Sequence, residues 1–152
     1  MPQVTIILGS KSDLKYWEDS KKYLEYFDIS SNIEILSAHR TPDKLSFYIR
    51  DAEKNKCQVI IAAAGMAAHL AGAIAANTTL PVLGVPLPGG ILDGLDALLS
   101  TVQMPSGVPV ATFAVGTAGM RNACVFAAQI LSLNDPNLRI KLKKFKDQGS
   151  KL

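Results

Sequence analysis

The hydrophobic positions of the chain form two alternating patterns. Short, mostly apolar runs at residues 4–8, 33–36, 59–63, 82–85 and 110–115 predict strands, and the continuously apolar run 4–8 is typical of a strand buried on both faces of a sheet. Between and after these runs, apolar residues recur at helical spacing in residues 12–28, 42–54, 67–77, 92–102 and 120–131. Strands that alternate with helices at this spacing predict βαβ units and a parallel sheet with helices on both faces.

A further helical segment lies at residues 134–148. Asn134 is its predicted cap and Pro136 lies in its first turn, while Leu138, Leu142 and Phe145 recur at helical spacing. This apolar side packs either on its own subunit or on a neighbouring one, and the pattern leaves both arrangements open. We therefore predict a single domain over residues 1–152, with a C-terminal helix and a basic tail at about 135–152.

Composition and charge narrow the class of protein. A chain of 152 residues that is 48% hydrophobic suffices for one domain with a sizeable core. The net charge of +3 comes from residues 139–152, where six Lys or Arg and one Asp give +5 and leave −2 elsewhere. A nucleic-acid-binding face is therefore not indicated.

Two further features bear on where the protein works. Cys57 and Cys124 lie far apart inside apolar runs, and no signal peptide is recognisable at the N-terminus, which predicts buried, reduced thiols in a cytoplasmic protein. Residues 59–76 are long enough to imitate a membrane span. They contain His69, two glycines and mostly alanine, so we expect no span and no membrane partner.

Polar residues follow the first two predicted strands directly. In "GSKSD", residues 9–13, Ser10 and Ser12 offer hydroxyls and free amides at a helix start, where an anion is favoured. Asp13 suits either a sugar hydroxyl or a simple helix cap, and capping by Ser12 or Asp13 explains this loop equally well.

The second loop, "SAHRTPD" at residues 37–43, contains more than a helix start requires. Thr41 is a suitable cap, followed by Pro42 and Asp43 in the first turn. His39 and Arg40 cap nothing, and a cation before a positive helix end is unfavourable unless an anion binds there. A phosphate would supply that anion, with Arg40 able to bind it bidentately.

The third and fourth loops are built from small residues. "AAAGMAAHLAG", residues 62–72, contains His69, which by itself is more often a packed or capping histidine than a functional one. "GVPLPGG", residues 84–90, suits a close-fitting backbone wall, although any α/β fold needs tight turns.

In this order, "GSKSD", "SAHRTPD" and "AAHLAG", followed by "PVLGVP", "QMPSGVPV" and "NACVFAAQIL", closely resemble the PurE family of purine biosynthesis over residues 4–131. The resemblance implies a three-layer, flavodoxin-like (Rossmann-like) α/β subunit with a central five-stranded parallel sheet, assembled as a homo-octamer. It implies an enzyme that interconverts carboxylated aminoimidazole ribonucleotides without metal or organic cofactor.

Arg40, Pro42, Asp43 and His69 match the family class that is a mutase, which converts N5-carboxyaminoimidazole ribonucleotide to 4-carboxy-5-aminoimidazole ribonucleotide in IMP biosynthesis. Two alternatives remain: direct carboxylation of aminoimidazole ribonucleotide with CO2, and a flavodoxin-like nucleotide-binding module without enzymatic activity.

Carried over by position, the resemblance assigns acid/base catalysis to His39 and a second catalytic role to His69, which we expect to bond the departing carboxylate. Ribose and phosphate contacts fall on Ser10, Asp13 and Arg40, with help from Ser12 and Ser37, and the CO2-holding wall includes Gly65 and Ala67. Ala63, Met66 and Ala71 depart from the commonest family pattern, which has Gly, Gly and Pro there.

Overall fold

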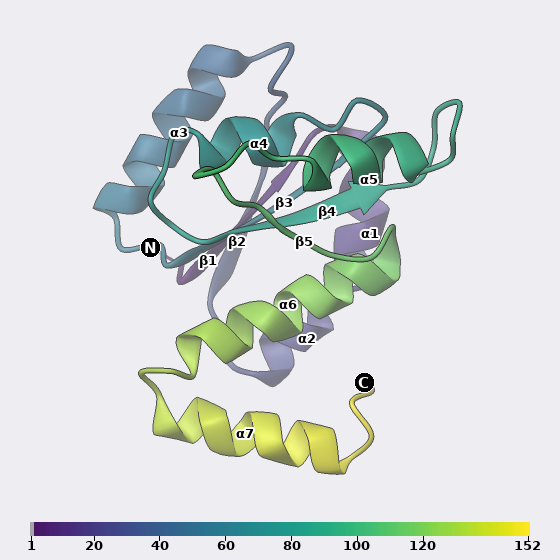
Figure 1. The fold of residues 1–152 in the computed structure, drawn as a ribbon. Coiled ribbons are helices and arrows are strands. Elements are labelled where there is room, and N and C mark those ends of the chain that lie inside the picture. Colours follow the sequence, from purple (N-terminus) through teal and green to yellow (C-terminus); the bar gives the residue numbers. More distant parts are fainter. Residues whose placement is uncertain (1) are drawn as a thin grey trace.

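The computed structural model describes residues 2–152 and is built around a parallel sheet of five strands in the order β2-β1-β3-β4-β5. The strands are β1 (Val4–Leu8), β2 (Ser31–Ile35), β3 (Val59–Gly65), β4 (Val82–Leu87) and β5 (Ala111–Thr112) (Figure 1). This is the strand order of flavodoxin-like folds, in which the chain reverses direction across the sheet between β1 and β3. The predicted fold class is confirmed.

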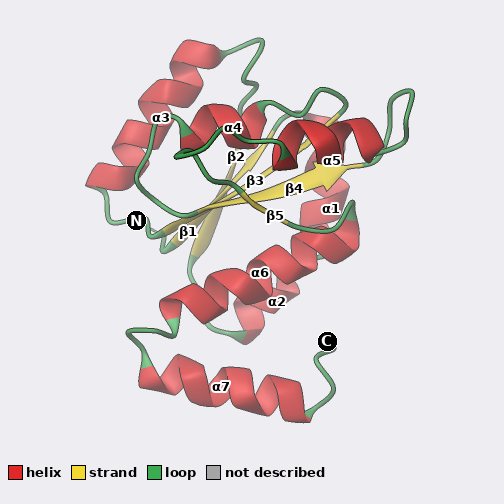
Figure 2. Ribbon diagram, in the orientation of Figure 1, coloured by secondary structure: helices red, strands yellow, loops and turns green. Residues whose placement is uncertain are grey.

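Helices cover both faces of the sheet (Figure 2). One face carries α1 (Leu14–Glu18), α2 (Lys22–Tyr26) and α6 (Thr117–Leu131), with α7 (Pro136–Asp147) outside them. The other carries α3 (Pro42–Lys54), α4 (Leu70–Ala75) and α5 (Leu95–Val102). Side chains of β1 alternate between the two layers, since Ile6 and Leu8 pack on the first face and Ile7 on the second.

The predicted single helix over residues 12–28 is wrong. The chain instead forms a 3₁₀ turn (Lys11–Asp13), α1 and α2, with a break between the two helices. Ser20 lies fully buried in this break, and its hydroxyl donates to the Tyr16 carbonyl at 2.7 Å. The N–H groups of Ser20 and Lys21 both bond to the Trp17 carbonyl at 2.8 Å, which tightens the turn and interrupts the α-helix.

The fifth strand is also shorter than the predicted range of 110–115. Only Ala111 and Thr112 pair with β4 as a regular ladder, although Phe113 N–H donates to the Gly84 carbonyl at 3.0 Å. Further along, Gly116 N–H donates to the Pro86 carbonyl at 2.9 Å. Proline has no N–H to return to that neighbour, so the regular ladder ends before Pro86 is reached.

Two predicted helices begin later than expected. The prediction of 67–77 becomes α4 at Leu70, because residues 66–69 form tight turns, and the prediction of 92–102 becomes α5 at Leu95. Asp93 and Gly94 precede α5 with positive φ values of 45° and 100°. Left-handed backbone cannot continue into an α-helix, so these residues belong to the loop.

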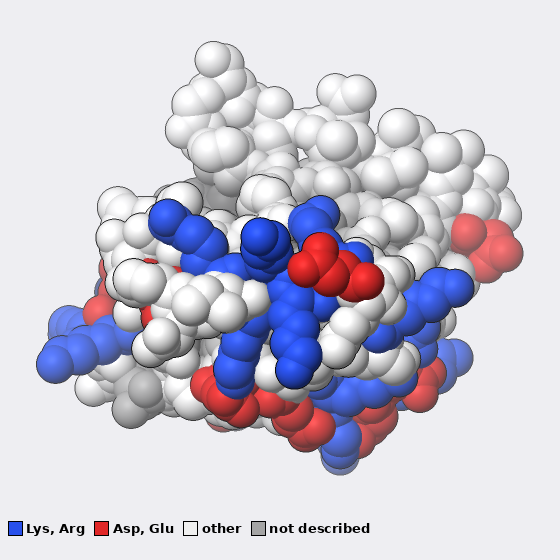
Figure 3. Space-filling view, turned by 90° about the horizontal axis from the view of Figure 1, so that it is seen from below, with Lys and Arg blue, Asp and Glu red and all other residues white. Residues whose placement is uncertain are grey.

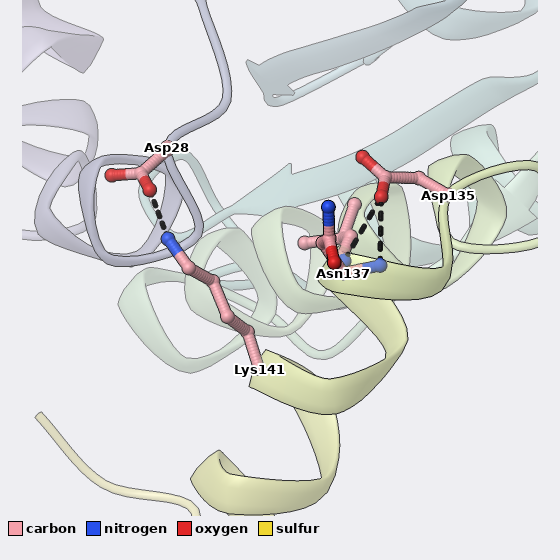
Figure 4. A network of polar contacts seen from close by, with 5 residues as sticks. Asp28, Asp135, Asn137 and Lys141 are labelled. Carbon is pink, nitrogen blue, oxygen red and sulfur yellow. Dashed lines mark hydrogen bonds and ion pairs between the residues drawn. The ribbon is translucent and has the colours of Figure 1, made fainter.

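The last helix packs on its own subunit, which decides between the two arrangements that the sequence left open. Leu138, Leu142 and Phe145 are all buried, and the Phe145 ring lies 5.4 Å from that of Phe27. The predicted cap at Asn134 is wrong. Asp135 caps α7 instead, because its carboxylate accepts the N–H groups of Asn137 and Leu138 at 2.9 and 3.1 Å (Figure 4).

The exposed side of α7 is basic but mixed in charge. Lys141 pairs with Asp28, at the end of the α2 segment (Figure 4). Figure 3, which views the molecule from the side of α7, shows Lys and Arg side chains interspersed with Asp and Glu rather than forming one uniform patch.

Two predictions about the interior can also be compared with the structure. Cys57 and Cys124 are both buried and unpaired, and burial raises the pKa of the Cys124 thiol to about 12. The stretch 59–76 is divided between β3 and α4. Within residues 2–152, no helix combines the length and the apolar character that crossing a membrane requires.

Candidate active site

Three loops leave the sheet side by side at the point where the strand order reverses. Leu36 N–H donates to the Leu8 carbonyl at 2.9 Å, and Gly9 N–H donates to the Ala63 carbonyl at 3.0 Å, so the ends of β1, β2 and β3 are in register. Ligands of such sheets bind outside the carboxyl ends of the strands at this switch point. The predicted site residues lie on these loops.

His39 and His69 come from different loops and face each other. Nε2 of His39 lies 2.6 Å from Nδ1 of His69, and the two rings are nearly perpendicular, with an interplanar angle of 88°. At this distance one of the two nitrogens must carry a proton and donate it to the other. Both side chains are exposed, so the pair is open to a ligand.

The first loop forms a compact polar group. Ser10 N–H donates to the Asp13 carboxylate at 3.0 Å, and the hydroxyls of Ser10 and Ser12 lie 2.6 Å apart. Burial raises the pKa of the half-buried Asp13 carboxyl, while the bond from Ser10 opposes this effect. A hydroxyl donor from a ligand would favour the ionised form of Asp13 in the same way as the Ser10 N–H.

The second loop is held by Ser37 and Thr41. Arg40 N–H donates to the Ser37 hydroxyl at 3.1 Å, and Thr41 Oγ1 both accepts from Ser37 N–H at 3.0 Å and donates to the Ser37 carbonyl at 3.1 Å. Thr41 stands at the predicted cap position, but its side chain makes no capping bond to α3. Its hydroxyl is already engaged by Ser37, so it fixes the loop instead.

The guanidinium of Arg40 is available to an anion. Its side chain is exposed, and the two ion pairs found in residues 2–152 are Lys21 with Glu18 and Lys141 with Asp28. Within that range no carboxylate therefore neutralises Arg40. An unpaired arginine before a helix N-terminus is suited to phosphate.

The third and fourth loops leave neighbouring strands, since Gly65 and Leu87 pair at the ends of β3 and β4. A methyl group added at Gly65 would lie 3.4 Å from the Leu87 carbonyl oxygen, which is an ordinary contact distance between paired strands. Ala67 is exposed in the turn that leads to His69. Behind His69, a cavity of about 540 Å³ extends between α4 and α5 and is lined by His69, Gly72, Ala73, Leu99, Ser100, Gln103 and Met104.

The predicted residues therefore form three hydrogen-bonded groups at one edge of the sheet: Ser10 with Ser12 and Asp13, Ser37 with Arg40, and His39 with His69. Sequence reasoning missed two carboxylates that lie next to the glycines of the fourth loop, Asp93 before α5 and Asp96 in its first turn. Asp93 accepts the N–H of Gly89 at 3.2 Å, and Asp96 Oδ2 would lie 3.0 Å from a methyl group at Gly90. The available signal was two acidic residues three and six positions after the glycine pair Gly89–Gly90.

The described residues contain no cluster of side chains that could bind a metal ion. Among residues 2–152, no three His, Cys, Asp or Glu side chains lie close enough together to hold a metal ion. The expectation of catalysis without metal or organic cofactor stays a prediction.

Comparison with known proteins matches nearly the whole chain. The family model for AIR carboxylase matches residues 3–151. N5-carboxyaminoimidazole ribonucleotide mutase of Pyrococcus abyssi is 50% identical over 147 residues, covering 97% of this chain and 83% of the relative. The Escherichia coli K12 protein of the same name is 49% identical over 144 residues, covering 95% and 85%.

The fold is also similar to that of a solved structure. The crystal structure of Treponema denticola PurE superposes with a TM-score of 0.89 at 28% identity, covering 99% of this chain and 92% of that one. The resemblance that the loop motifs predict is confirmed, and the chain belongs to the AIR carboxylase family, to which PurE proteins belong.

Proposed function

We propose that this protein is an N5-carboxyaminoimidazole ribonucleotide mutase of purine biosynthesis, an isomerase whose acid/base centre is His39. The observation that carries the assignment of roles is the 2.6 Å contact between His39 and His69 at the switch point of the sheet. The name of the relatives at about 50% identity supports the same reaction.

The first chemical step needs a proton donor near the substrate's exocyclic nitrogen. The carbamate N–C bond breaks with its electron pair left on that nitrogen, which takes a proton from the His39 imidazolium, and CO2 is released. Carbon 4 of the electron-rich ring is then nucleophilic, so no electron-sink group is needed.

The second step uses the neutral imidazole that the first step leaves. Carbon 4 attacks the CO2, a new C–C bond forms, and carbon 4 becomes tetrahedral. His39 then removes the proton from carbon 4, which restores the aromatic ring and regenerates the imidazolium. Imidazole suits this exchange because its ordinary pKa of about 6.5 allows both protonation states near neutral pH.

His69 is the partner of His39 in this cycle. Because one proton lies between Nε2 of His39 and Nδ1 of His69, the hydrogen bond fixes the orientation of the His39 ring. The other nitrogen of His69 remains for the carboxylate that departs and returns. The role first assigned to His69, a bond to this carboxylate, stays part of the proposal.

The remaining site residues bind and position the nucleotide. Arg40 binds the phosphate, and Asp13 with Ser10, Ser12 and Ser37 binds the ribose and the phosphate oxygens. These contacts lie away from the reacting carbon, so they contribute by positioning the nucleotide with carbon 4 next to the CO2. Gly65 and Ala67 supply a close-fitting backbone wall next to the reacting groups.

The assembly that we propose is a homo-octamer working in the cytoplasm. His39, Arg40 and His69 are exposed in a single subunit, which leaves little to exclude water from the reaction. Apolar side chains are also exposed nearby: Ile91 is 95% exposed, and Leu95 and Leu99 on α5 are 50% and 47% exposed. Neighbouring subunits that cover these side chains would also enclose the site.

An isotope experiment tests the reaction class. Substrate labelled in its carboxylate is converted in a single turnover with a large excess of unlabelled bicarbonate and without ATP. A mutase returns most of the label in the product, since CO2 is formed and consumed in one pocket. Full equilibration with bicarbonate would instead favour direct carboxylation of aminoimidazole ribonucleotide, and the absence of any turnover would favour a nucleotide-binding module.

A light-scattering measurement tests the assembly. A monomer that turns over at the full rate would contradict the octamer and leave the assignment of the reaction intact.

A further inference from the structure

Met66 adopts an uncommon backbone conformation at the edge of the site. Its φ angle is +52°, in the left-handed region that glycine adopts freely and a side chain with a Cβ disfavours. Burial does not offset this cost, because 63% of the residue is exposed. Strained, exposed residues next to a reaction centre are reason to look for a function.

The Met66 side chain bridges two loops. A methyl group added at Gly90, in the β4–α5 loop (residues 88–94), would lie only 2.9 Å from Met66 Cγ, so the side chain already rests on the Gly90 backbone. Met66 is at the same time fixed relative to His69. Ala68 N–H donates to the Met66 carbonyl at 2.9 Å, and His69 N–H donates to the Ala67 carbonyl at 2.8 Å.

The β4–α5 loop also approaches the end of β3 at Pro88, whose carbonyl oxygen would lie 3.7 Å from a methyl group added at Gly65. Gly89 and Gly90 have φ values of 117° and 71°, and Ile91 at the loop tip is 95% exposed. The Asp93 carboxylate accepts the Gly89 N–H from within the same loop, which shapes the loop without tying it to β3. The contact between Met66 and Gly90 is thus a direct link from this loop to the segment that carries His69.

Resting on the mutase function proposed above, we propose that Met66 is a positioning residue that holds the β4–α5 loop over the His39–His69 pair and so retains CO2 between its release and its recapture. CO2 is small and uncharged, so polar groups bind it weakly and enclosure must keep it in place. A thioether side chain is apolar and fills irregular space, which suits a wall against such a molecule.

The test compares three substitutions at one position. Met66→Gly removes the side chain at a residue whose φ suits glycine. Met66→Asn also removes the apolar side chain, while asparagine tolerates left-handed backbone. Met66→Leu keeps an apolar side chain of similar volume and is the rescue variant. Each is assayed by label retention in a single turnover with excess unlabelled bicarbonate, by KM for the nucleotide, and by hydrogen exchange of residues 88–94.

For Met66→Gly and Met66→Asn we expect retained label to fall to roughly half of the unmodified value or less, because an open wall lets CO2 leave. Hydrogen exchange of residues 88–94 should accelerate, and KM for the nucleotide should stay unchanged. Met66→Leu should show the label retention and the loop exchange of the unmodified protein. A loss of fold would raise KM and exchange throughout the chain.

The inference would be overturned if Met66→Gly retained as much label as the unmodified protein, or if the hydrogen exchange of residues 88–94 did not change. If the unmodified protein itself exchanges all its label, the mutase function fails. Loop exchange then still decides whether Met66 holds the loop.

Discussion

Nε2 of His39 lies 2.6 Å from Nδ1 of His69, and the two imidazoles meet edge to face although they are 30 residues apart in the chain. This contact exists because β2 and β3 flank β1 and end at the same edge of the sheet. A proton held between the rings leaves one nitrogen of each ring free for substrate. The pair therefore combines a proton donor and acceptor in a single site without a third ionisable group.

The first prediction concerns the acid/base role. His39→Asn should leave the fold and nucleotide binding intact, because Asn preserves a polar side chain of similar size. Turnover should fall by about 100- to 10,000-fold, since the amide cannot exchange a proton near neutral pH. Single-turnover rates and product binding measured on the same sample check this. Turnover close to that of the unmodified protein would mean that another group moves the proton.

The second prediction concerns phosphate binding. Arg40→Ala should raise KM by roughly 30-fold, which corresponds to about 2 kcal/mol for a lost charge-assisted contact. The turnover number should change far less, because the phosphate lies away from the reacting carbon. Arg40→Lys is the matched variant, since it keeps the charge but loses the planar fork, and its KM should lie between the other two. Equal KM values for all three proteins would show that Arg40 does not meet the phosphate.

The alternation of apolar runs was sufficient to predict the parallel sheet, because the central strands β1, β3 and β4 are buried and leave a strong signal in sequence. The helix 42–54 was also predicted correctly, since Pro42 marks its start. The breaks were not predictable in this way. The interruption between α1 and α2 depends on a buried Ser20 hydroxyl bonding to the Tyr16 carbonyl, and a serine in a polar stretch shows nothing of its burial.

The site was predictable to the extent that family motifs identify its residues. Residue order alone also indicated that loops after β1, β2 and β3 would meet, because parallel strands end at one edge. The contact of Met66 with Gly90 was not predictable, since it depends on how two loops bend beyond the sheet. The same limit applies to Thr41, whose hydroxyl bonds to Ser37 rather than capping α3.

The third prediction concerns the docking of α7. Phe145→Ala should destabilise the subunit by about 3 to 5 kcal/mol, because its buried ring packs against Tyr23, Tyr26 and Phe27. Ile140→Ala on the same helix is the control: this side chain is 68% exposed, so its loss should change stability by less than about 0.5 kcal/mol. Urea unfolding followed by circular dichroism measures both values. Similar midpoints for the two variants would show that α7 does not pack on its own subunit in solution.

The fourth prediction concerns the pH dependence of stability. The Glu53 carboxylate, near the end of α3, accepts bonds from the Thr78 hydroxyl at 2.5 Å and from Thr79 N–H at 2.8 Å. These bonds favour the charged form and lower the pKa of Glu53 from its ordinary value of 4.5. A carboxyl whose pKa is lower in the folded state stabilises the fold above the unfolded pKa, and this contribution is lost as the pH falls through the folded pKa.

Glu53→Gln should therefore have a lower melting temperature than the unmodified protein at pH 7. This difference should shrink as the pH falls below about 4.5, because the Glu53 carboxyl then becomes protonated and loses its charge. Glutamine keeps the size and one acceptor oxygen, so the difference between the proteins reports the charge. Asp147→Asn, at an exposed carboxyl near the end of α7, is the control and should shift the melting temperature little at any pH. If the melting temperatures of the unmodified protein and Glu53→Gln differ by the same amount at pH 7 and at pH 3, the bonds to Thr78 and Thr79 do not depend on the ionised carboxylate.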